Sequence, residues 1–415
     1  MELIYSISGW LFLLLGLAIS IGLHELGHLW PAKKFGVKVT KYMIGFGPTL
    51  FSRKRGDTEY GVKAIPLGGY IQMVGMMPPT TSDRKNLWQR LTAFAQPLEH
   101  PAVAPEDEDK TFYKLAPWKK LIIMFSGPFA NLLIALVLAL VLFSGFGSYE
   151  QNTKINSIVA CVPTDANPNC DAQGEDSPAK VAGLKAGDQI LEFNGASVRY
   201  WSEVVPLLKE AVGSSASILV LRQGEEIQLS ISPVNLTLGG QTRPYLGVYL
   251  EAERVQKSPG DAIGIVGSML AATGNMILQL PVQSIQAVSE IVPGSPRNSE
   301  GVISIVGLGQ FSGQIAADSS ISLEDKLLSE LGMLMSLNIA LFVFNMVPLV
   351  PLDGGHMAGG IYEWIKRGIW RIRGKKLEKP VDTGQMMPIA YVVGILLLVL
   401  TLILVIRDIT NPLQL

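Results

Sequence analysis

The chain has 415 residues, of which 48% are hydrophobic and 17% charged, and its formal net charge is −1. This nearly neutral balance excludes the broad basic field of a nucleic-acid-binding protein, so no nucleic acid is expected among its partners. Two cysteines, Cys161 and Cys170, are too few for a disulfide-built scaffold and are wrongly spaced for a thiolate zinc site.

Apolar residues gather into long runs, which indicates a polytopic α-helical protein of the lipid bilayer. A helix needs roughly 20 such residues to cross the hydrocarbon layer. Four segments are predicted as transmembrane helices: 4–30, 121–146, 328–356 and 388–406. The first segment lacks the basic start and the cleavage signal of a signal peptide, so we expect it to remain in the protein.

Lysine and arginine residues mark the cytoplasmic side of a membrane protein. They concentrate after the first predicted span and between the third and fourth, whereas the C-terminal tail has only Arg407. We therefore expect a multi-pass protein of the plasma membrane with both termini extracytoplasmic. A linker at 76–118 and a basic loop at 357–385 are then cytoplasmic, and the segment 150–325 is extracytoplasmic.

A fifth span over 262–280 is the alternative to this four-span topology. The stretch contains three glycines, an asparagine and a glutamine, and it is less apolar than the four others. We instead expect an amphipathic helix at the membrane surface, within an extracytoplasmic linker at 255–325.

The first span contains the sequence HELGH, from His24 to His28, inside an otherwise apolar helix. Residues four apart lie on one face of a helix, so both imidazoles can point at one ion. Two imidazoles suit zinc, and Glu25 is placed to take a proton from a metal-bound water. In a soluble protein such residues often form a solvated helix face, but ionisable groups inside a membrane are costly and mark function. The pattern therefore predicts a catalytic metal site.

A catalytic zinc usually has a third protein ligand, and the sequence offers few candidates. His100 lies in a proline-rich, acidic linker and is expected to be solvated. Asp353 is the one acid in the polar stretch 345–356, where prolines break the third apolar run. Irregular backbone at membrane depth is tolerated where it lines a cavity. We predict Asp353 as the third ligand; His356 is the alternative, although packing beside the site suits it better.

The pairing of His24 with Asp353 depends on the topology. About twenty residues of helix carry the chain roughly 30 Å, which takes HELGH toward the cytoplasmic side. The second span returns outward, and the third delivers Asp353 to the same side as the histidines. A fifth span at 262–280 would place Asp353 on the opposite side, so four spans are consistent with one shared site.

These motifs resemble those of the site-2 protease family of intramembrane zinc metalloproteases. HELGH fits the family's HExxH, and NMVPLVPLDGG at 345–355 fits its Asn-x-x-Pro and Leu-Asp-Gly motif. Shorter stretches at 45–48, 126–131 and 301–309 are also similar to family sequences. The resemblance covers nearly the whole chain and fits best the bacterial, actinobacterial-type members with a single extracytoplasmic PDZ module.

The resemblance implies roles for individual residues and for partners. The implied ligands of Zn²⁺ are His24, His28 and Asp353. Glu25 would be the general base, and Asn345 with Pro348 would help to hold the unwound substrate. Implied substrates are single-span membrane proteins, such as anti-sigma factors, that an upstream site-1 protease has already cut on their outer side.

The segment 31–75 has strand-like pieces between glycines and lies next to the proposed site in the sequence. The resemblance implies a re-entrant β element on the cytoplasmic side that pairs with the substrate backbone, and it places Gly68, Gly69 and Tyr70 there. A helical substrate hides its amides, so cleavage needs local unwinding and a strand edge that receives the freed chain. An ordinary basic anchor at the membrane interface is the alternative.

The segment 150–250 resembles a PDZ domain, an α+β module that binds extended peptides. Strand residues 190–193 precede an Asn-Gly turn, an amphipathic helix covers 204–212, and strands follow at 218–221 and 227–231. Substrate selection by strand addition and steric exclusion of bulky ectodomains are equally supported roles. Cys161 and Cys170 lie on the oxidising side in this orientation, so a disulfide could close the loop between them.

We therefore expect a zinc-dependent endopeptidase, with hydrolysis of a peptide bond inside a transmembrane helix. A non-catalytic scaffold that binds membrane proteins through its PDZ module is one alternative, and a metal transporter with a His and Asp relay is another. The intact Glu25 disfavours the scaffold. A transporter usually shows repeated polar spans, whereas the polar motifs here occur twice and converge on one point.

Overall fold

The computed structural model describes residues 2–78, 103–164, 167, 170, 174–238, 241–292, 301–374 and 381–412. His100 and most of the predicted cytoplasmic linker lie outside these residues. The chain divides into two compact units, one formed by Met1–Leu142 with Pro259–Leu415 and the other by Phe143–Ser258. We call them the helical unit and the small unit.

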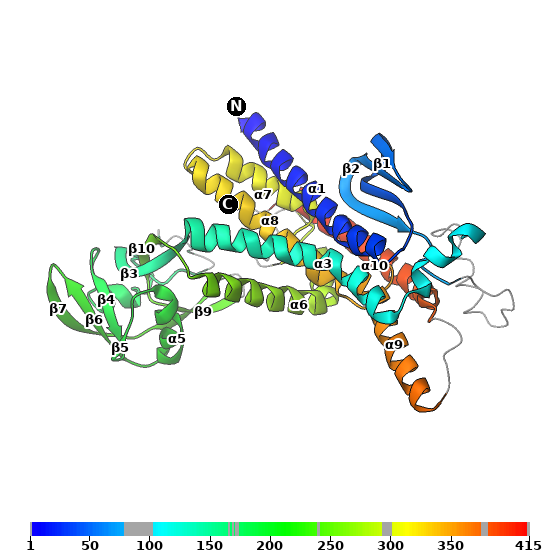
Figure 1. Cartoon of the computed structure of the whole chain (residues 1–415). Helices are drawn as coiled ribbons and strands as arrows, with labels where there is room; N and C mark the ends of the chain where they lie inside the picture. The colour runs from blue at the N-terminus through cyan, green and yellow to red at the C-terminus, as the bar shows by residue number, and fades with distance from the viewer. Residues whose placement is uncertain are drawn as a thin grey trace. The chain divides into compact units, whose positions relative to one another are not determined.

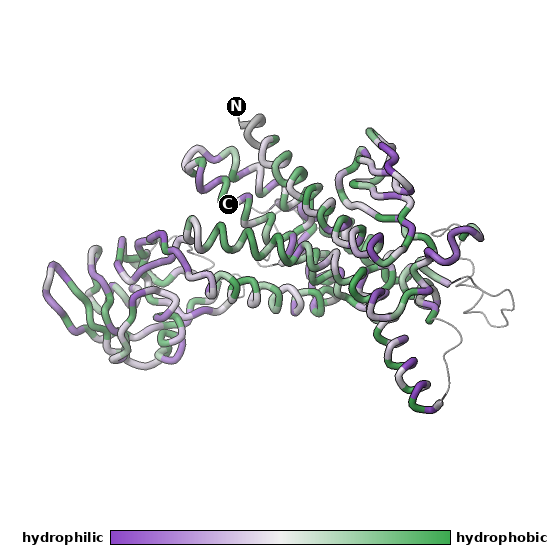
Figure 2. Tube along the Cα trace, in the orientation of Figure 1, coloured by the Kyte–Doolittle hydropathy of each residue, from purple (hydrophilic) through white to green (hydrophobic). Residues whose placement is uncertain are grey.

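The helical unit consists mainly of long helices (Figure 1). Their bounds are α1 (Glu2–Lys34), α3 (Pro117–Ala139), α6 (Pro259–Ser289), α7 (Ile305–Ala317), α8 (Leu323–Asn345), α9 (Asp353–Ile372) and α10 (Met387–Thr410). The short 3-10 helices are η1 (Pro105–Lys110), η2 (Phe112–Lys114) and η4 (Thr383–Met386). Helix α3 continues into a π-helical stretch, η3 (Leu140–Phe146). Figure 2 shows that hydrophobic residues dominate most of these helices.

Five helical segments within the described ranges are long and apolar enough to cross a membrane, which fits a multi-pass membrane protein. They are Ile7–Lys34, Pro117–Phe146, Pro259–Leu280, Leu323–Asn345 and Met387–Thr410. The stretch 262–280, expected to be an amphipathic surface helix, is part of the 31-residue α6. By length and composition α6 qualifies as a span, so the predicted number of four spans is not confirmed.

Helices α1 and α8 run in the same direction, and α3 runs against them. Gly16 of α1 lies against Leu334 of α8, and four residues further along both helices the Asn338 amide donates to Ser20 Oγ at 3.0 Å. Along α3 the order is reversed, because the earlier residue His24 contacts the later residue Asn131, whereas His28 contacts Ile123. The ends of α1 and α8 therefore meet at one end of the helical unit, with the start of α3.

Two bent strands, β1 (Val39–Arg55) and β2 (Thr58–Met73), form the predicted β element beside α1. Residues 41–44 pair with 69–72 on one side and with 59–62 on the other, and 52–55 also pair with 58–61. The two strands thus fold back on themselves into a sheet with segment order 49–55, 58–65, 39–46 and 69–73. Gly45 and Gly47 adopt φ values of +93° and +82° where β1 turns back, a conformation that glycine adopts without steric cost.

Prolines end the third predicted span earlier than expected. Helix α8 stops at Asn345, seven non-helical residues follow, and α9 begins at Asp353. Proline lacks an N–H and restricts the residue before it, which stops the helix ahead of Pro348 and Pro351. The predicted single span 328–356 and the basic loop 357–385 are therefore corrected: Asp353 to Ile372 is one helix.

The small unit contains a sheet with strand order β10-β3-β4-β6-β7, to which β5 adds by pairing with β4. Its strands are β3 (Ser148–Ile158), β4 (Gln189–Phe193), β5 (Ala196–Ser197), β6 (Ala216–Arg222), β7 (Glu225–Ile231) and β10 (Val248–Val255), with a separate hairpin of β8 (Val234–Leu238) and β9 (Gln241–Tyr245). Helices α4 (Pro178–Val181) and α5 (Trp201–Ala211) complete it. The strands and helix predicted from 190 to 231 are confirmed at β4, α5, β6 and β7.

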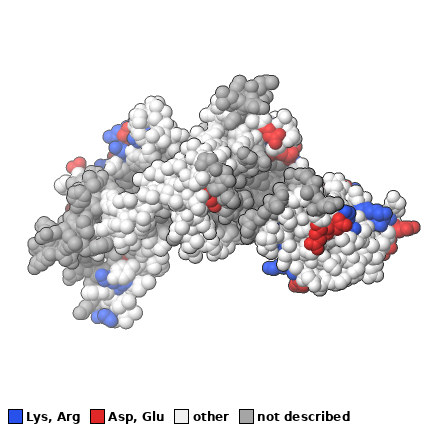
Figure 3. All heavy atoms as spheres, turned by 180° about the vertical axis from the view of Figure 1, so that it is seen from behind, with Lys and Arg blue, Asp and Glu red and all other residues white. Residues whose placement is uncertain are grey.

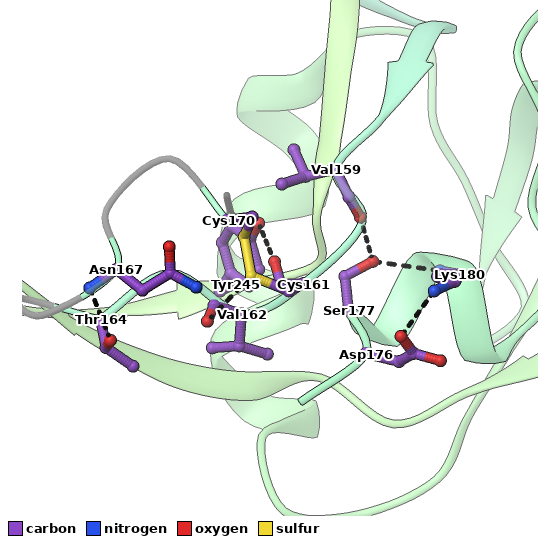
Figure 4. Close-up of a disulfide and its surroundings, with 10 residues drawn as sticks. All are labelled: Val159, Cys161, Val162, Thr164, Asn167, Cys170, Asp176, Ser177, Lys180 and Tyr245. Atoms are coloured by element: carbon purple, nitrogen blue, oxygen red, sulfur yellow. Dashed lines mark hydrogen bonds and ion pairs between the residues drawn. A yellow bond between two sulfur atoms is a disulfide. The ribbon is translucent and has the colours of Figure 1, made fainter. Parts of the chain in front are cut away.

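Burial of apolar side chains from both helices and strands holds the small unit together. Phe193, Ile190, Ile218 and Leu208 are fully or almost fully buried in one cluster. Figure 4 shows the disulfide between Cys161 and Cys170 in this unit. The Tyr245 hydroxyl donates to the carbonyl of Cys161 at 3.3 Å, which ties this loop to β9.

Candidate active site

The HELGH sequence lies in the last third of α1, and its three polar side chains are buried. His24, Glu25 and His28 are each at most 9% exposed. The helix carries His24 and His28 on one face, as their spacing predicts, so that their rings meet edge to face with centroids 4.8 Å apart. This face points toward α3 and the start of α9.

Asp353 reaches the histidines because the first turn of α9 packs tightly on the non-helical segment before it. A side chain at Gly354 would collide with the backbone of Met346 and Val347, and one at Gly355 with the backbone of Leu349 and Val350. The two glycines after Asp353 thus allow the backbone to approach closely. This explains why the Asp353 carboxylate can lie at the depth of HELGH.

His24, His28 and Asp353 form a triangle of ligand atoms. Asp353 Oδ2 lies 3.3 Å from His24 Nε2 and 3.3 Å from His28 Nε2, and the two Nε2 atoms are 3.2 Å apart. They are the one group of His, Cys, Asp or Glu residues among the described parts of the chain whose ligand atoms converge in this way. Asp353 Oδ2 is buried and has no hydrogen-bond partner there.

Neighbouring oxygens fix the orientation of both imidazole rings. The His28 Nδ1–H donates to the backbone carbonyl of Ile123 at 2.6 Å, and His24 Nδ1 lies 2.9 Å from Asn131 Oδ1. Because both oxygens accept, each ring carries its proton on Nδ1. The two Nε2 atoms therefore present lone pairs toward each other and toward Asp353.

This arrangement fits a zinc ion. Donor atoms bound about 2.0–2.1 Å from a tetrahedral zinc lie roughly 3.3 Å apart, which matches all three edges of the triangle. A histidine that binds zinc through one ring nitrogen typically donates a hydrogen bond from its other ring nitrogen to an amide or carbonyl oxygen. An unpartnered buried carboxylate oxygen facing two nitrogen lone pairs is explained by a cation between them.

Close contact between α1 and α3 makes room for these groups. A side chain at Gly127 of α3 would collide with the imidazole of His28, and one at Gly27 of α1 would collide with the carbonyl of Ser126. Small residues allow membrane helices to approach this closely. The short distance between the two backbones puts Ile123 and Asn131 within reach of the histidines.

The last segment of β2 lies against Glu25. A side chain at Gly69 would contact Ile21 and Glu25 of α1, and the backbone of Ile71 lies near the Glu25 carboxylate. The Tyr42 hydroxyl of β1 also donates to the carbonyl of Gly22 at 2.7 Å. These contacts hold one edge of the sheet, residues 69–73, beside the general-base candidate.

The predicted substrate-binding residues fall into two groups. Tyr70 belongs to the sheet edge with Gly69, and Gly68 directly precedes this edge. Gly68 has φ +140° and lies against the ring of Phe46, on which Tyr70 stacks with 6.5 Å between ring centroids. Asn345 and Pro348 lie just before Asp353, half-buried and exposed respectively.

His356 does not belong to the ligand triangle. Its ring is buried and meets the ring of Phe112 edge to face at 6.5 Å, on the η2 side of α9. This position agrees with packing beside the site, which is the role that the sequence favours for His356.

The roles of Asn131 and Ile123 were not predicted. Asn131 is fully buried in an apolar helix, and a polar side chain at such a position was the signal that could have identified it. Ile123 contributes a backbone carbonyl, which no side-chain pattern can reveal.

The profile of peptidase family M50 matches residues 12–387 of this chain. The zinc metalloprotease Rip1 of Mycobacterium tuberculosis is 30% identical, over 99% of this chain and 99% of its own length. Rip1 of Mycolicibacterium smegmatis is 31% identical over 96% of this chain and 97% of its own, and the zinc metalloprotease RasP of Shouchella clausii is 26% identical over 92% and 94%.

Proposed function

Because this chain belongs to peptidase family M50, the site-2 protease family, and is a zinc metalloprotease, we propose that it cleaves a peptide bond within the transmembrane helix of single-span membrane proteins. The observation that carries this proposal is the triangle of His24, His28 and Asp353. The two histidines lie with Glu25 toward the end of α1, a helix long and apolar enough to cross a membrane, and Asp353 joins them from the start of α9.

His24, His28 and Asp353 hold zinc in this proposal, and Glu25 is the general base. Bound zinc would lower the pKa of a water molecule and polarise the scissile carbonyl. Glu25 accepts a proton from the attacking water while the water oxygen forms a bond to the scissile carbonyl carbon. The protonated Glu25 then gives this proton to the amide nitrogen as the C–N bond breaks, so the carboxylate is regenerated.

The edge of β2 receives the substrate backbone. Residues 69–73 pair with β1 on one side, and their other edge has no strand partner within the described ranges. An unwound substrate can therefore add as a further strand through backbone hydrogen bonds. Gly69 keeps this edge close to Glu25, and Asn345 with Pro348 helps to hold the unwound substrate.

Four membrane crossings agree best with the contacts at the end of α6. The guanidinium of Arg407, near the end of α10, lies 3.2 Å from the Glu290 carboxylate just after α6. The backbone of Ser304 donates to Asp408 at 2.7 Å, and Ser312 of α7 lies against Gly9 of α1. The end of α6 thus lies at the end of the unit where α1 begins, away from Asp353. Helix α6 then does not deliver the chain to the cytoplasmic side.

The distribution of basic residues supports an orientation with both termini extracytoplasmic and the metal site toward the cytoplasm. In this orientation the small unit is extracytoplasmic, where a PDZ module would select substrates or exclude bulky ectodomains. Anti-sigma factors trimmed by a site-1 protease are the substrate class that the family resemblance favours. The disulfide of Cys161 and Cys170 is consistent with an oxidising compartment.

The proposal is tested with purified protein and a model single-span substrate. Wild type should cleave within the helix, and Glu25→Gln should reduce kcat by at least about 10²-fold because the proton acceptor is lost. A chelator should abolish cleavage, and added zinc should restore it in the wild type.

Glu330→Gln is the matched control, because Glu330 is another buried carboxylate of a spanning helix, bonded to Ser312 away from the site. It should cleave like the wild type. Cleavage by Glu25→Gln at the wild-type rate would refute the mechanism, and binding without cleavage by any variant would favour a PDZ scaffold.

A further inference from the structure

Helix α9 carries an exposed apolar face after it leaves the active site. Five large residues form this surface, which we call the α9 face: Ile361, Trp364, Ile365, Ile369 and Ile372. They are between 45% and 88% exposed. Ile361, Ile365, Ile369 and Ile372 follow one another at intervals of three or four residues, and Trp364 comes three residues after Ile361, so all five lie on one side of the helix. No described element covers them, although a solvated helix would present polar residues there.

Basic residues flank the α9 face. Lys366, Arg371 and Arg373 lie on either side of it, and Lys366 extends over the ring of Tyr362 at 5.7 Å. The opposite side of the helix packs against protein. The buried Glu363 carboxylate on that side lies 2.7 Å from the Lys120 ammonium and 2.5 Å from the Arg367 guanidinium. The helix therefore presents its apolar side outward, and Figure 3 shows blue surface among white on this projecting part.

The first half of α9 fixes its level relative to the spanning helices. Glu363 binds Lys120, and a side chain at Gly360 would contact Leu121 and Pro117 at the start of α3. Figure 1 shows α9 turned across the direction of α3 from this point.

Exposed tryptophans mark the same level on α1 and α3. Trp118 and Trp30 are both exposed. The Lys119 ammonium lies 5.6 Å from the ring centroid of Trp118, and the Lys34 ammonium lies 5.0 Å from that of Trp30. Exposed tryptophan beside lysine is typical of the membrane–water interface. Helix α9 thus leaves the helical unit at the depth of one interface.

From these observations we propose that the α9 face binds the anionic phospholipid surface of the leaflet on the active-site side. The isoleucines and Trp364 enter the acyl boundary, and Lys366, Arg371 and Arg373 contact lipid phosphates. The geometry matches an interfacial helix, with its apolar side outward and its basic residues along the flanks. Since α9 begins at Asp353, lipid contact also restrains the helix that carries this carboxylate.

The test uses spin labels on the full chain in nanodiscs of phosphatidylcholine with phosphatidylglycerol. The label is attached to Ile365→Cys, and the native cysteines do not compete because they are disulfide-bonded. Labels at Leu396→Cys, on the exposed apolar side of α10, and at Asp109→Cys, in the solvated η1 turn, serve as lipid and water references. Molecular oxygen should enhance the relaxation of the Ile365 label about as strongly as that of the Leu396 label. A water-soluble nickel complex should not relax the Ile365 label.

Two results would overturn the proposal. A label at Ile365 that the nickel complex reaches as readily as it reaches Asp109 would show that the face is solvated. A label shielded from both relaxants, with spin–spin broadening between labelled chains, would show that a second copy covers it instead.

The charge of the lipid is tested with Arg371→Gln and Arg373→Gln in the Ile365→Cys background. Each basic residue near an anionic surface contributes about 1 kcal/mol, or about fivefold in the ratio of docked to undocked label. This ratio should fall by that factor for each change in nanodiscs with phosphatidylglycerol, and much less in phosphatidylcholine alone. An equal fall in both lipids, or none, would contradict recognition of anionic lipid.

Discussion

At the scale of single residues, the metal triangle depends on a glycine that is not itself a ligand. Gly127 of α3 leaves the space in which the imidazole of His28 lies. Any larger residue at this position must displace the ring from the carbonyl of Ile123 or separate α3 from α1. The geometry of the ligands is therefore set by packing as well as by chemistry.

We predict that Gly127→Ala lowers zinc content and proteolysis together. The added Cβ overlaps the His28 ring, so Nε2 can no longer lie 3.3 Å from Asp353 Oδ2. Zinc affinity should fall by at least about tenfold, the loss typical when the support of a ligand is disturbed. Metal analysis of the purified variant measures this. Gly394→Ala in α10 is the control, since a Cβ there meets open space; equal zinc content in both variants would argue against the prediction.

The histidine pair illustrates what sequence can predict at this scale. The spacing of four residues was enough to place His24 and His28 on one face, because that geometry is local to the helix. Their partners Asn131 and Ile123 come from a helix some 95 to 107 residues away, and the choice depends on how closely α1 and α3 pack. Tertiary packing of this kind has no local sequence period.

At the scale of elements, a buried ion pair joins the start of β4 to the end of β6 in the small unit. Asp188 is fully buried before β4 and accepts hydrogen bonds from Arg222, at the end of β6, at 2.8 and 2.7 Å. The backbone N–H of Lys185 adds a third at 2.8 Å. Burial alone would raise the pKa of the Asp188 carboxyl, but these bonds hold that pKa below its ordinary value.

The lowered pKa predicts how stability changes with pH. The carboxylate is favoured in the folded state, so its contribution is complete above the unfolded pKa of about 3.9 and is lost as the pH falls through the folded value. Asp188→Asn should remove this acid dependence and destabilise β4 and β6 by about 1–3 kcal/mol at neutral pH. Hydrogen exchange of the full chain measures the loss. Asp176→Asn, which breaks an exposed pair with Lys180, should change exchange by less than about 0.5 kcal/mol.

Helix α9 shows why some elements were missed from the sequence. The cluster of basic residues from Lys366 onward favours a cytoplasmic loop, although Ile361, Ile365 and Ile369 recur every four residues, as in a helix. An amphipathic helix at an interface has both features. The β element was expected, but its double pairing was not, because the bends at Gly45 and Gly47 decide which segments meet.

At the scale of the whole molecule, the number of crossings is the question that sequence leaves open. Composition makes 259–280 apolar enough to span, whereas the shared site of His24 and Asp353 requires an even number of crossings between them. The first argument is local and the second depends on where distant residues meet. The ion pair of Glu290 with Arg407 agrees with the second.

Cysteine accessibility in intact cells tests this topology. With four crossings, the end of α6 faces the same side as the end of α10, because Glu290 and Asn411 lie together through a 3.2 Å hydrogen bond. Ser289→Cys and Asn411→Cys should then react with a membrane-impermeant maleimide from outside, and Arg373→Cys only after permeabilisation. The native cysteines do not react with the maleimide because they are disulfide-bonded. Labelling of Ser289→Cys only after permeabilisation would mean that α6 crosses, and the return of the chain to α7 would then need a further passage through the membrane.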